Sequence, residues 1–247
     1  MVAHRCWASV LFGLLAAVHP AMAATRSGCV GPVRVALDIG HTLSQPGATS
    51  ARGTTEFGFN QALGRVVAET LARAGIATSV IGASGARLAL AERTHEAQRA
   101  GATLFLSLHH DSVQPQYLIG WQVTGRALRY SDAFGGYSLF ISGLNPRAQD
   151  SQRFATHLGA RLNAAGFTPS LHHAEPIAGE NRPLLQAKIG LYRFDELAVL
   201  RGAPMPAVLL EAGIIVNRQE EMRLQDPAAI ARMADAIVSA IQQYCPA

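Results

Sequence analysis

The sequence is poor in several kinds of residue, and each shortage excludes a class of protein. Only 15% of its 247 residues are charged and 6% are aromatic. There is no run of lysine and arginine and no interleaving of aromatic with basic residues, so we expect no nucleic-acid partner. Beyond the first 23 residues, no segment approaches the roughly 20 uninterrupted apolar residues that a membrane helix needs. We therefore expect no membrane span. Internal repeats and low-complexity tracts are also absent.

The N-terminal stretch has the pattern of an export signal. Arg5 precedes an apolar run at 7–18, and Ala21-Met22-Ala23 offers a cleavage site for a signal peptidase. We therefore predict a signal peptide at 1–23 and one exported domain at 24–247, in the periplasm, with release outside the cell as the alternative. Loss of Arg5 reduces the formal charge of +4 by one, which is a mild bias that favours an anionic polymer such as cell wall.

Export would leave two of the three cysteines, Cys29 near the start of the chain and Cys245 near its end. An oxidising compartment favours a disulfide between them, and closing so long a loop contributes about 4–5 kcal/mol in the chain-entropy model. Two free thiols are the alternative.

Apolar runs and helical periodicity alternate along the chain. Glycines at 75, 101 and 166 follow three of the predicted helices, as C-terminal caps do. Asp226 and Pro227 are typical of a helix start, and Ile230, Met233 and Ile237 begin its apolar stripe. The predicted strands are 33–37, 76–81, 103–108, 120–124 and 206–210, and the predicted helices are 63–74, 87–100, 151–165 and one from 227 onward.

The alternation of strands and helices predicts an α/β fold with a single domain and a mainly parallel central sheet flanked by helices. Strands that are nearly all apolar indicate burial on both faces, as in parallel sheets. The regions 130–150 and 167–197 look like loop-rich decoration on this core.

Four candidates for metal binding or catalysis follow the predicted strands. His41 and Glu56 come after the first strand, His109 ends the third, and Glu211 ends the strand at 206–210. The carboxyl ends of parallel strands meet at one edge, so these side chains should gather there. Two histidines and a carboxylate form a three-ligand set for a catalytic zinc, and a further carboxylate is needed as general base.

Each residue also has a plainer interpretation. A histidine at a strand end is commonly a hydrogen-bonded structural residue, and Glu56 stands where an acidic side chain stabilises a helix N-terminus. Asp38 and Asp111 are candidates to orient the ligands, although Asp38 could equally be a buried structural acid.

The same residues lie in four blocks that resemble the zinc-dependent N-acetylmuramoyl-L-alanine amidases (amidase type 3). In order, the blocks are 35–41 (VALDIGH), 55–56 (TE), 107–111 (SLHHD) and 208–217 (VLLEAGIIVN). Ile39 stands where the family usually has proline, and Thr42-Leu43 replaces a common glycine pair. Neither departure removes a candidate ligand.

The resemblance implies hydrolysis of the amide between N-acetylmuramic acid and L-alanine of the peptidoglycan stem. It assigns His41, Glu56 and His109 to a Zn²⁺ ion and Glu211 to general-base catalysis. Peptidoglycan is then the substrate, a protein activator is a candidate partner, and the enzyme is expected to be a monomer. The alternatives are a zinc peptidase that cuts within the stem peptide, and a non-catalytic relative that only binds cell wall.

Two further questions concern histidines. His109 and His110 are adjacent on a strand, so only one can face the metal, and the block alignment selects His109. The region 167–197 holds His172, His173, Glu175 and Glu180. Some family members carry a covering glutamate at about this place, while the plainer interpretation is that these side chains are solvated or line a substrate groove.

Overall fold

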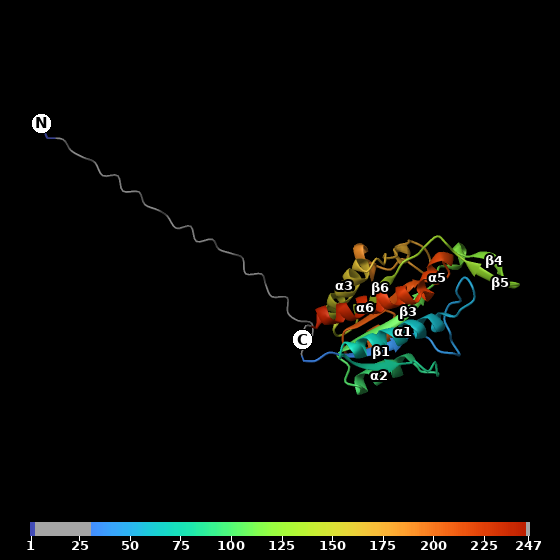
Figure 1. Cartoon of the computed structure of the whole chain (residues 1–247), viewed down its shortest axis with the longest axis horizontal. Coiled ribbons are helices and arrows are strands. Elements are labelled where there is room, and N and C mark those ends of the chain that lie inside the picture. The colour runs from blue at the N-terminus through green and yellow to red at the C-terminus, as the bar shows by residue number, and fades with distance from the viewer. Residues whose placement is uncertain (3–30, 246–247) are drawn as a thin grey trace.

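A seven-stranded sheet forms the centre of the molecule (Figure 1). The structure is a computed structural model that describes residues 1–2 and 31–245, so Cys29 and most of the predicted signal peptide lie outside the described residues. The strand order is β2-β1-β3-β9-β6-β8-β7. The strands are β1 (Arg34–Ile39), β2 (Ala77–Ile81), β3 (Leu104–Asp111), β6 (Ser138–Ile141), β7 (Leu184–Gln186), β8 (Leu191–Arg193) and β9 (Ala207–Ile214).

The strands that precede the candidate site run parallel. β1 pairs with β2 and β3, and β3 pairs with β9, all in parallel register. β6 runs antiparallel to β9, and β7 runs antiparallel to β8. The predicted single α/β domain with a mainly parallel sheet is therefore confirmed, and the strand that carries Glu211 is parallel to its neighbour β3.

Helices cover both faces of the sheet unequally. The apolar side chains of α1, α3 and α6 form one large core with alternate residues of β1, β3 and β9, whereas α2 and α4 cover the other face with a smaller cluster. The helices are α1 (Glu56–Arg73), α2 (Leu90–Arg99), α3 (Ala148–Ala164), α4 (Ala198–Gly202), α5 (Arg218–Gln225) and α6 (Pro227–Tyr244). The thinner cover leaves room at the edge of the α2/α4 face.

Helix starts follow the capping chemistry of the sequence. Asp226 accepts a hydrogen bond from the amide of Ala228, and Pro227 is the first residue of α6, as predicted. The start of α1 was placed too late, because its N-cap is Thr55, whose hydroxyl accepts from the Gly58 amide. Glu56 is consequently the first residue of α1.

The two regions expected to be decoration are part of the central sheet, so that prediction is wrong. β6 lies within 130–150, and β7 and β8 lie within 167–197. These strands have only three or four residues each, and they pair with β9 or with one another. The predicted strand at 120–124 does form, as β4 (Ile119–Val123), but it pairs with β5 (Arg126–Tyr130) in a separate hairpin.

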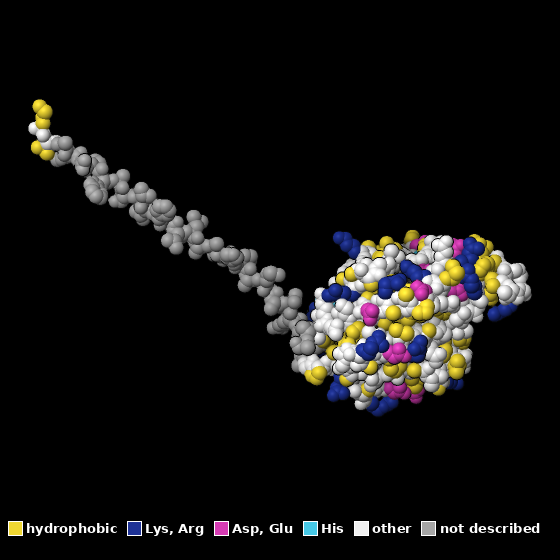
Figure 2. All heavy atoms as spheres, viewed as in Figure 1, with side chains coloured by type: hydrophobic (Ala, Val, Ile, Leu, Met, Phe, Trp, Pro, Cys, Tyr) yellow, Lys and Arg dark blue, Asp and Glu magenta, His cyan; other side chains and the backbone are white. Residues whose placement is uncertain are grey.

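Charged side chains of both signs lie on the surface. On the side shown in Figure 2, basic and acidic side chains are interspersed over the helices. Cys245 is disulfide-bonded and only 8% exposed. Among the residues that the structure describes, no helix is long and apolar enough to cross a membrane.

Candidate metal centre and active site

The four candidate residues lie at the carboxyl edge of β1, β3 and β9. His109 and Glu211 are partners in the register between β3 and β9. Alternation along a strand places His109 with Phe105 and Glu211 with Leu209, on the face covered by α2 and α4. The chemistry therefore gathers where the helical cover is thinner.

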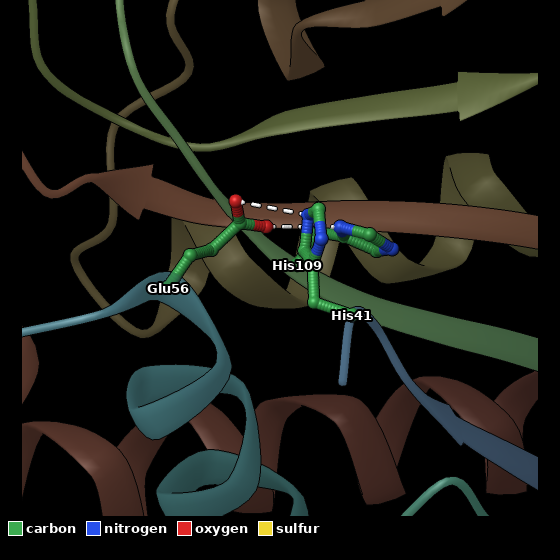
Figure 3. Close-up of side chains that lie close together, drawn as sticks. All are labelled: His41, Glu56 and His109. Carbon is green, nitrogen blue, oxygen red and sulfur yellow. Dashed lines mark hydrogen bonds and ion pairs between the residues drawn. The ribbon is translucent and has the colours of Figure 1, made fainter. Parts of the chain in front are cut away.

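His41, Glu56 and His109 point toward one another (Figure 3). Each oxygen of the Glu56 carboxylate faces one imidazole: Oε2 lies 3.0 Å from His41 Nε2, and Oε1 lies 3.0 Å from His109 Nδ1. One ligand atom from each residue lies within 4.8 Å of the others. Tetrahedral zinc with bonds of about 2.0–2.1 Å separates its ligand atoms by about 3.3 Å, so the group needs little movement to enclose an ion.

The charge of Glu56 is balanced by the two imidazoles. Burial favours the neutral acid, but hydrogen bonds from His109 and His41 outweigh it and lower the pKa of Glu56. Burial likewise opposes protonation of His41, whereas the hydrogen bond and the negative charge of Glu56 raise the pKa of that imidazole. Glu56 also accepts a hydrogen bond of 3.0 Å from the Ala48 amide, which fixes the carboxylate against the preceding loop.

Backbone geometry brings the chain close to this group. A Cβ atom on Gly40 would overlap the ring of His109, and one on Gly47 would overlap both Glu56 and His41. His41 itself has φ of 68°, a left-handed conformation that a non-glycine residue seldom adopts. Such a conformation persists only where surrounding contacts impose it.

Arg93 supplies those contacts from α2. Its guanidinium donates to the carbonyl oxygen of Ile39 at 2.6 Å and to that of His41 at 2.7 Å. It also forms a buried ion pair of 2.6 Å with Asp38, whose other oxygen accepts from Ser107 Oγ. Of the two interpretations of Asp38, the contacts agree with a buried structural acid. Its ion-pair partner is the arginine side chain.

His110 lies on the opposite face of β3 from His109. It is 3% exposed, and its Nδ1 lies 2.7 Å from Asn60 Oδ1 on α1. Burial lowers the pKa of His110 to about 3, which keeps the imidazole neutral. The register thus brings His109, and not His110, to Glu56 and His41.

Glu211 lies across from His109 without joining the group of three. Its Oε2 atom is buried and has no hydrogen-bond partner among the described residues. Burial raises the pKa of Glu211 well above its usual value, and the negative charges of Asp111 and Glu56 raise it further. Among residues 31–245, Glu211 therefore has like charges nearby and no partner for Oε2.

Two cavities adjoin these residues. The first, of about 290 Å³, is lined by His41 and His109 together with apolar side chains of α2 and α4. The second, of about 200 Å³, is lined by Glu211 and by Asp111, His173 and Glu180. Leu197 lines both cavities.

The histidines and glutamates of 167–197 are engaged away from His41, Glu56 and His109. Glu180 accepts from His173 and from Gln114, and Glu175 accepts from the Tyr117 hydroxyl. The hypothesis of a covering glutamate therefore receives no support from these contacts. His172 and His173 were singled out in the sequence, but their contact with Asp111 was not predicted. The segments are far apart in the chain, so no spacing in the sequence signals this contact.

These features define a class of protein: an α/β domain with a His/Glu/His group at a sheet edge and a carboxylate beside it, as in metal-dependent hydrolases. The group fits a metal by its donor chemistry and by the close approach of Gly40 and Gly47.

The chain belongs to the N-acetylmuramoyl-L-alanine amidase family, Amidase_3, whose family model matches residues 35–243. Its reaction is accordingly the hydrolysis of the amide bond between N-acetylmuramic acid and L-alanine in peptidoglycan. The resemblance seen in the sequence, and the enzyme class it implied, are confirmed.

Individual relatives agree. The amidase AmiA of Escherichia coli is 26% identical over 235 residues, which cover 92% of this chain and 80% of AmiA. The catalytic domain of CwlV, an amidase from Bacillus (Paenibacillus) polymyxa var. colistinus, is 25% identical with a TM-score of 0.64, covering 86% of this chain and 97% of that domain. The CwlD amidase of Clostridioides difficile, solved in complex with the GerS lipoprotein, shares the fold at 19% identity and a TM-score of 0.60, covering 86% of this chain and 98% of CwlD.

Proposed function

We propose that His41, Glu56 and His109 hold a zinc ion and that Glu211 is the general base of the amidase reaction. The observation that supports this most is the convergence of three ligand atoms within 4.8 Å of one another, with Glu211 in register opposite His109. Two nitrogens and one carboxylate are a common protein ligand set for catalytic zinc and leave a coordination position open.

The bound ion would polarise the scissile carbonyl and lower the pKa of the attacking water. The work of the protein side chains is to position groups and to move one proton. Glu211 accepts a proton from the water molecule while the water oxygen attacks the carbonyl carbon. It then donates that proton to the nitrogen of L-alanine as the C–N bond breaks, which regenerates the carboxylate.

The remaining residues hold this arrangement in place. Arg93 fixes the carbonyl oxygen of His41, and Asp38 holds Arg93. The first cavity adjoins both histidines, so we assign it to the sugar or peptide next to the scissile bond. Asn60 keeps His110 on the far face of β3 and so keeps the register that aims His109.

We further propose an exported enzyme that acts in the periplasm, with residues 24–247 as the catalytic domain, on the strength of the signal-like N-terminus. A protein partner is a second part of this proposal. It is supported by the complex of the structurally similar CwlD with a lipoprotein.

The test combines metal content with product analysis for purified mature protein. We expect His41→Ala to lose the zinc ion held by His41, Glu56 and His109, and with it the activity. Glu211→Ala and Glu211→Gln should keep zinc but lose about 10²–10⁴-fold in rate, the usual contribution of general acid–base catalysis. Glu69→Gln, which changes an exposed glutamate of α1, is the matched control and should resemble the wild type.

Mass spectrometry of digested peptidoglycan identifies the bond that is cut. Intact stem peptides that begin with L-alanine support the amidase. Fragments cut within the stem would establish the peptidase alternative, and full activity of Glu211→Gln would refute the role given to Glu211.

A further inference from the structure

A second group of potential metal ligands lies beside the first. Asp111 Oδ2, at the end of β3, is 3.2 Å from His172 Nε2 and 2.9 Å from His173 Nε2. The two histidines stand on a short 3-10 helix, His172–Ala174, and their ring centroids are 3.8 Å apart. Three segments of the fold are thereby joined at one point: the end of β3, the turn after α3, and the loop that carries Glu180.

All three converging atoms are buried and lack hydrogen bonds. His172 is only 3% exposed and His173 only 9%. Despite the short distances, neither imidazole forms a hydrogen bond of acceptable geometry to Asp111, so all three atoms are without a hydrogen-bond partner among the described residues. Buried polar atoms in native proteins are almost always paired, and a set of three that face one another calls for an occupant.

The opposite ring nitrogens already have partners. His173 Nδ1 lies 2.8 Å from Glu180 Oε2, and His172 Nδ1 lies 2.9 Å from Ser170 Oγ. An ionised carboxylate can only accept, so the Nδ1 of His173 carries the hydrogen and donates it to Glu180. Burial lowers the pKa of His173, but the carboxylates of Asp111 and Glu180 outweigh it and raise that pKa to about 9. Nε2 of His173 therefore needs a cation, either a metal ion or a proton, between it and the oxygen of Asp111.

The surroundings have the form of a second shell. Metal-bound histidines usually donate their other N–H to a carboxylate, a hydroxyl or a carbonyl, which fixes the tautomer and the ring. Glu180 is itself anchored by a hydrogen bond of 2.8 Å from Gln114 Nε2. The second oxygen of Asp111 accepts from the Ser112 amide at 2.7 Å, which leaves Oδ2 for the convergence point.

From this geometry we infer a second metal site, in which Asp111 Oδ2, His172 Nε2 and His173 Nε2 bind a divalent ion of the zinc class. Two nitrogens and one oxygen are borderline ligands that suit Zn²⁺ better than the oxygen-preferring Ca²⁺ or Mg²⁺. The ligand separations are close to the roughly 3.3 Å of a tetrahedral zinc site. The cavity of about 200 Å³ lined by Asp111 and His173 gives the ion and a bound water access to the site.

The competing explanation is a proton. An imidazolium at His173 between Asp111 and Glu180 would also supply this positive charge, and it requires no metal. The two explanations differ in a countable quantity, the number of ions bound per chain, and also in which variants lose them.

The experiment counts zinc by mass spectrometry after the full mature protein is loaded with Zn²⁺ and freed of excess metal. We expect about two ions per chain for the wild type, about one for His173→Gln, and about one for His41→Ala. His95→Gln is the matched control, because His95 is an exposed histidine of α2, and it should retain both ions. About one ion in the wild type, lost in His41→Ala but kept in His173→Gln, would overturn the inference.

A second measurement covers the case in which His173→Gln does not fold. His41→Ala, which lacks the first site, is titrated with Co²⁺ and followed by visible absorption. Saturation at about one Co²⁺ per chain supports the second site, and no binding refutes it. Zinc retained by His41→Ala at the wild-type level, but lost in His173→Gln, would support this site while sinking the first, so the two proposals fail separately.

Discussion

The buried ion pair between Arg93 and Asp38 is the contact whose removal we expect to be most costly. The two side chains are 3% and 1% exposed, and NH1 lies 2.6 Å from Oδ1. Arg93→Met keeps an unbranched chain of similar length but leaves Asp38 with Ser107 Oγ as its remaining side-chain donor. Removing one member of a buried pair costs about 3–5 kcal/mol, because the other charge stays buried without compensation.

The same substitution also frees the backbone at His41. The carbonyl oxygens of Ile39 and His41 lose their donor, and nothing in α2 then holds His41 at its φ of 68°. We therefore expect zinc affinity to fall by about tenfold or more, equivalent to about 1.4 kcal/mol or more.

The assay is urea unfolding followed by circular dichroism, with a chelator present so that metal binding does not contribute to stability. Arg99→Met is the matched control, since Arg99 is an exposed arginine at the end of the same helix, and it should cost no more than about 1 kcal/mol. Combining Arg93→Met with Asp38→Asn removes the stranded charge and should recover about half of the lost stability without restoring zinc affinity.

Two results would refute this reasoning. If Arg93→Met and Arg99→Met lose similar stability, the buried pair does not hold the edge of the sheet. If the double variant regains zinc affinity together with stability, Arg93 does not act through the backbone of His41.

The remaining predictions concern Gly40, which follows β1, and Asn217, which follows β9. Gly40→Ala should displace His109, because the added Cβ would overlap its ring, and such overpacking costs about 1–3 kcal/mol. We expect Zn²⁺ binding, measured in a competition titration, to weaken by about tenfold. Gly120→Ala is the control, since its Cβ meets nothing within 4 Å, and it should bind Zn²⁺ as the wild type does. Asn217→Ala should cost about 1–2 kcal/mol in urea unfolding, because Asn217 caps α5 by accepting from two backbone amides at 3.0 Å. Asn217→Asp keeps the acceptor and should lose less, and an equal loss would argue against the cap.

Local sequence signals suffice for the central strands and for the last helix. The strands around β1, β3 and β9 were predictable because a strand buried on both faces must be apolar throughout, and α6 because Asp226 and Pro227 mark its start. The edge that carries His41, His109 and Glu211 followed from the rule that parallel strands place their carboxyl ends together.

β6, β7 and β8 could not be predicted in the same way. Each has three or four residues, which is too short for a periodicity to be distinguished from a loop. β6 and β8 are buried through pairing between segments far apart in the chain, and β7 is a partly buried strand that pairs with β8. The predicted helix at 63–74 begins later than α1 because residues 56–62 are of mixed polarity, and only the Thr55 cap reveals the start.

By itself, the sequence determined the family, the alternation of strands and helices, and the blocks that supply the candidate ligands, because these depend on residues close together in the chain. The tertiary structure decided which histidine of the 109–110 pair faces Glu56, since that depends on the register of β3 against α1 and β9. It also decided that Asp111 meets His172 and His173. The energy of a buried carboxylate among imidazoles depends on distances of about 3 Å, and only the folded chain sets them.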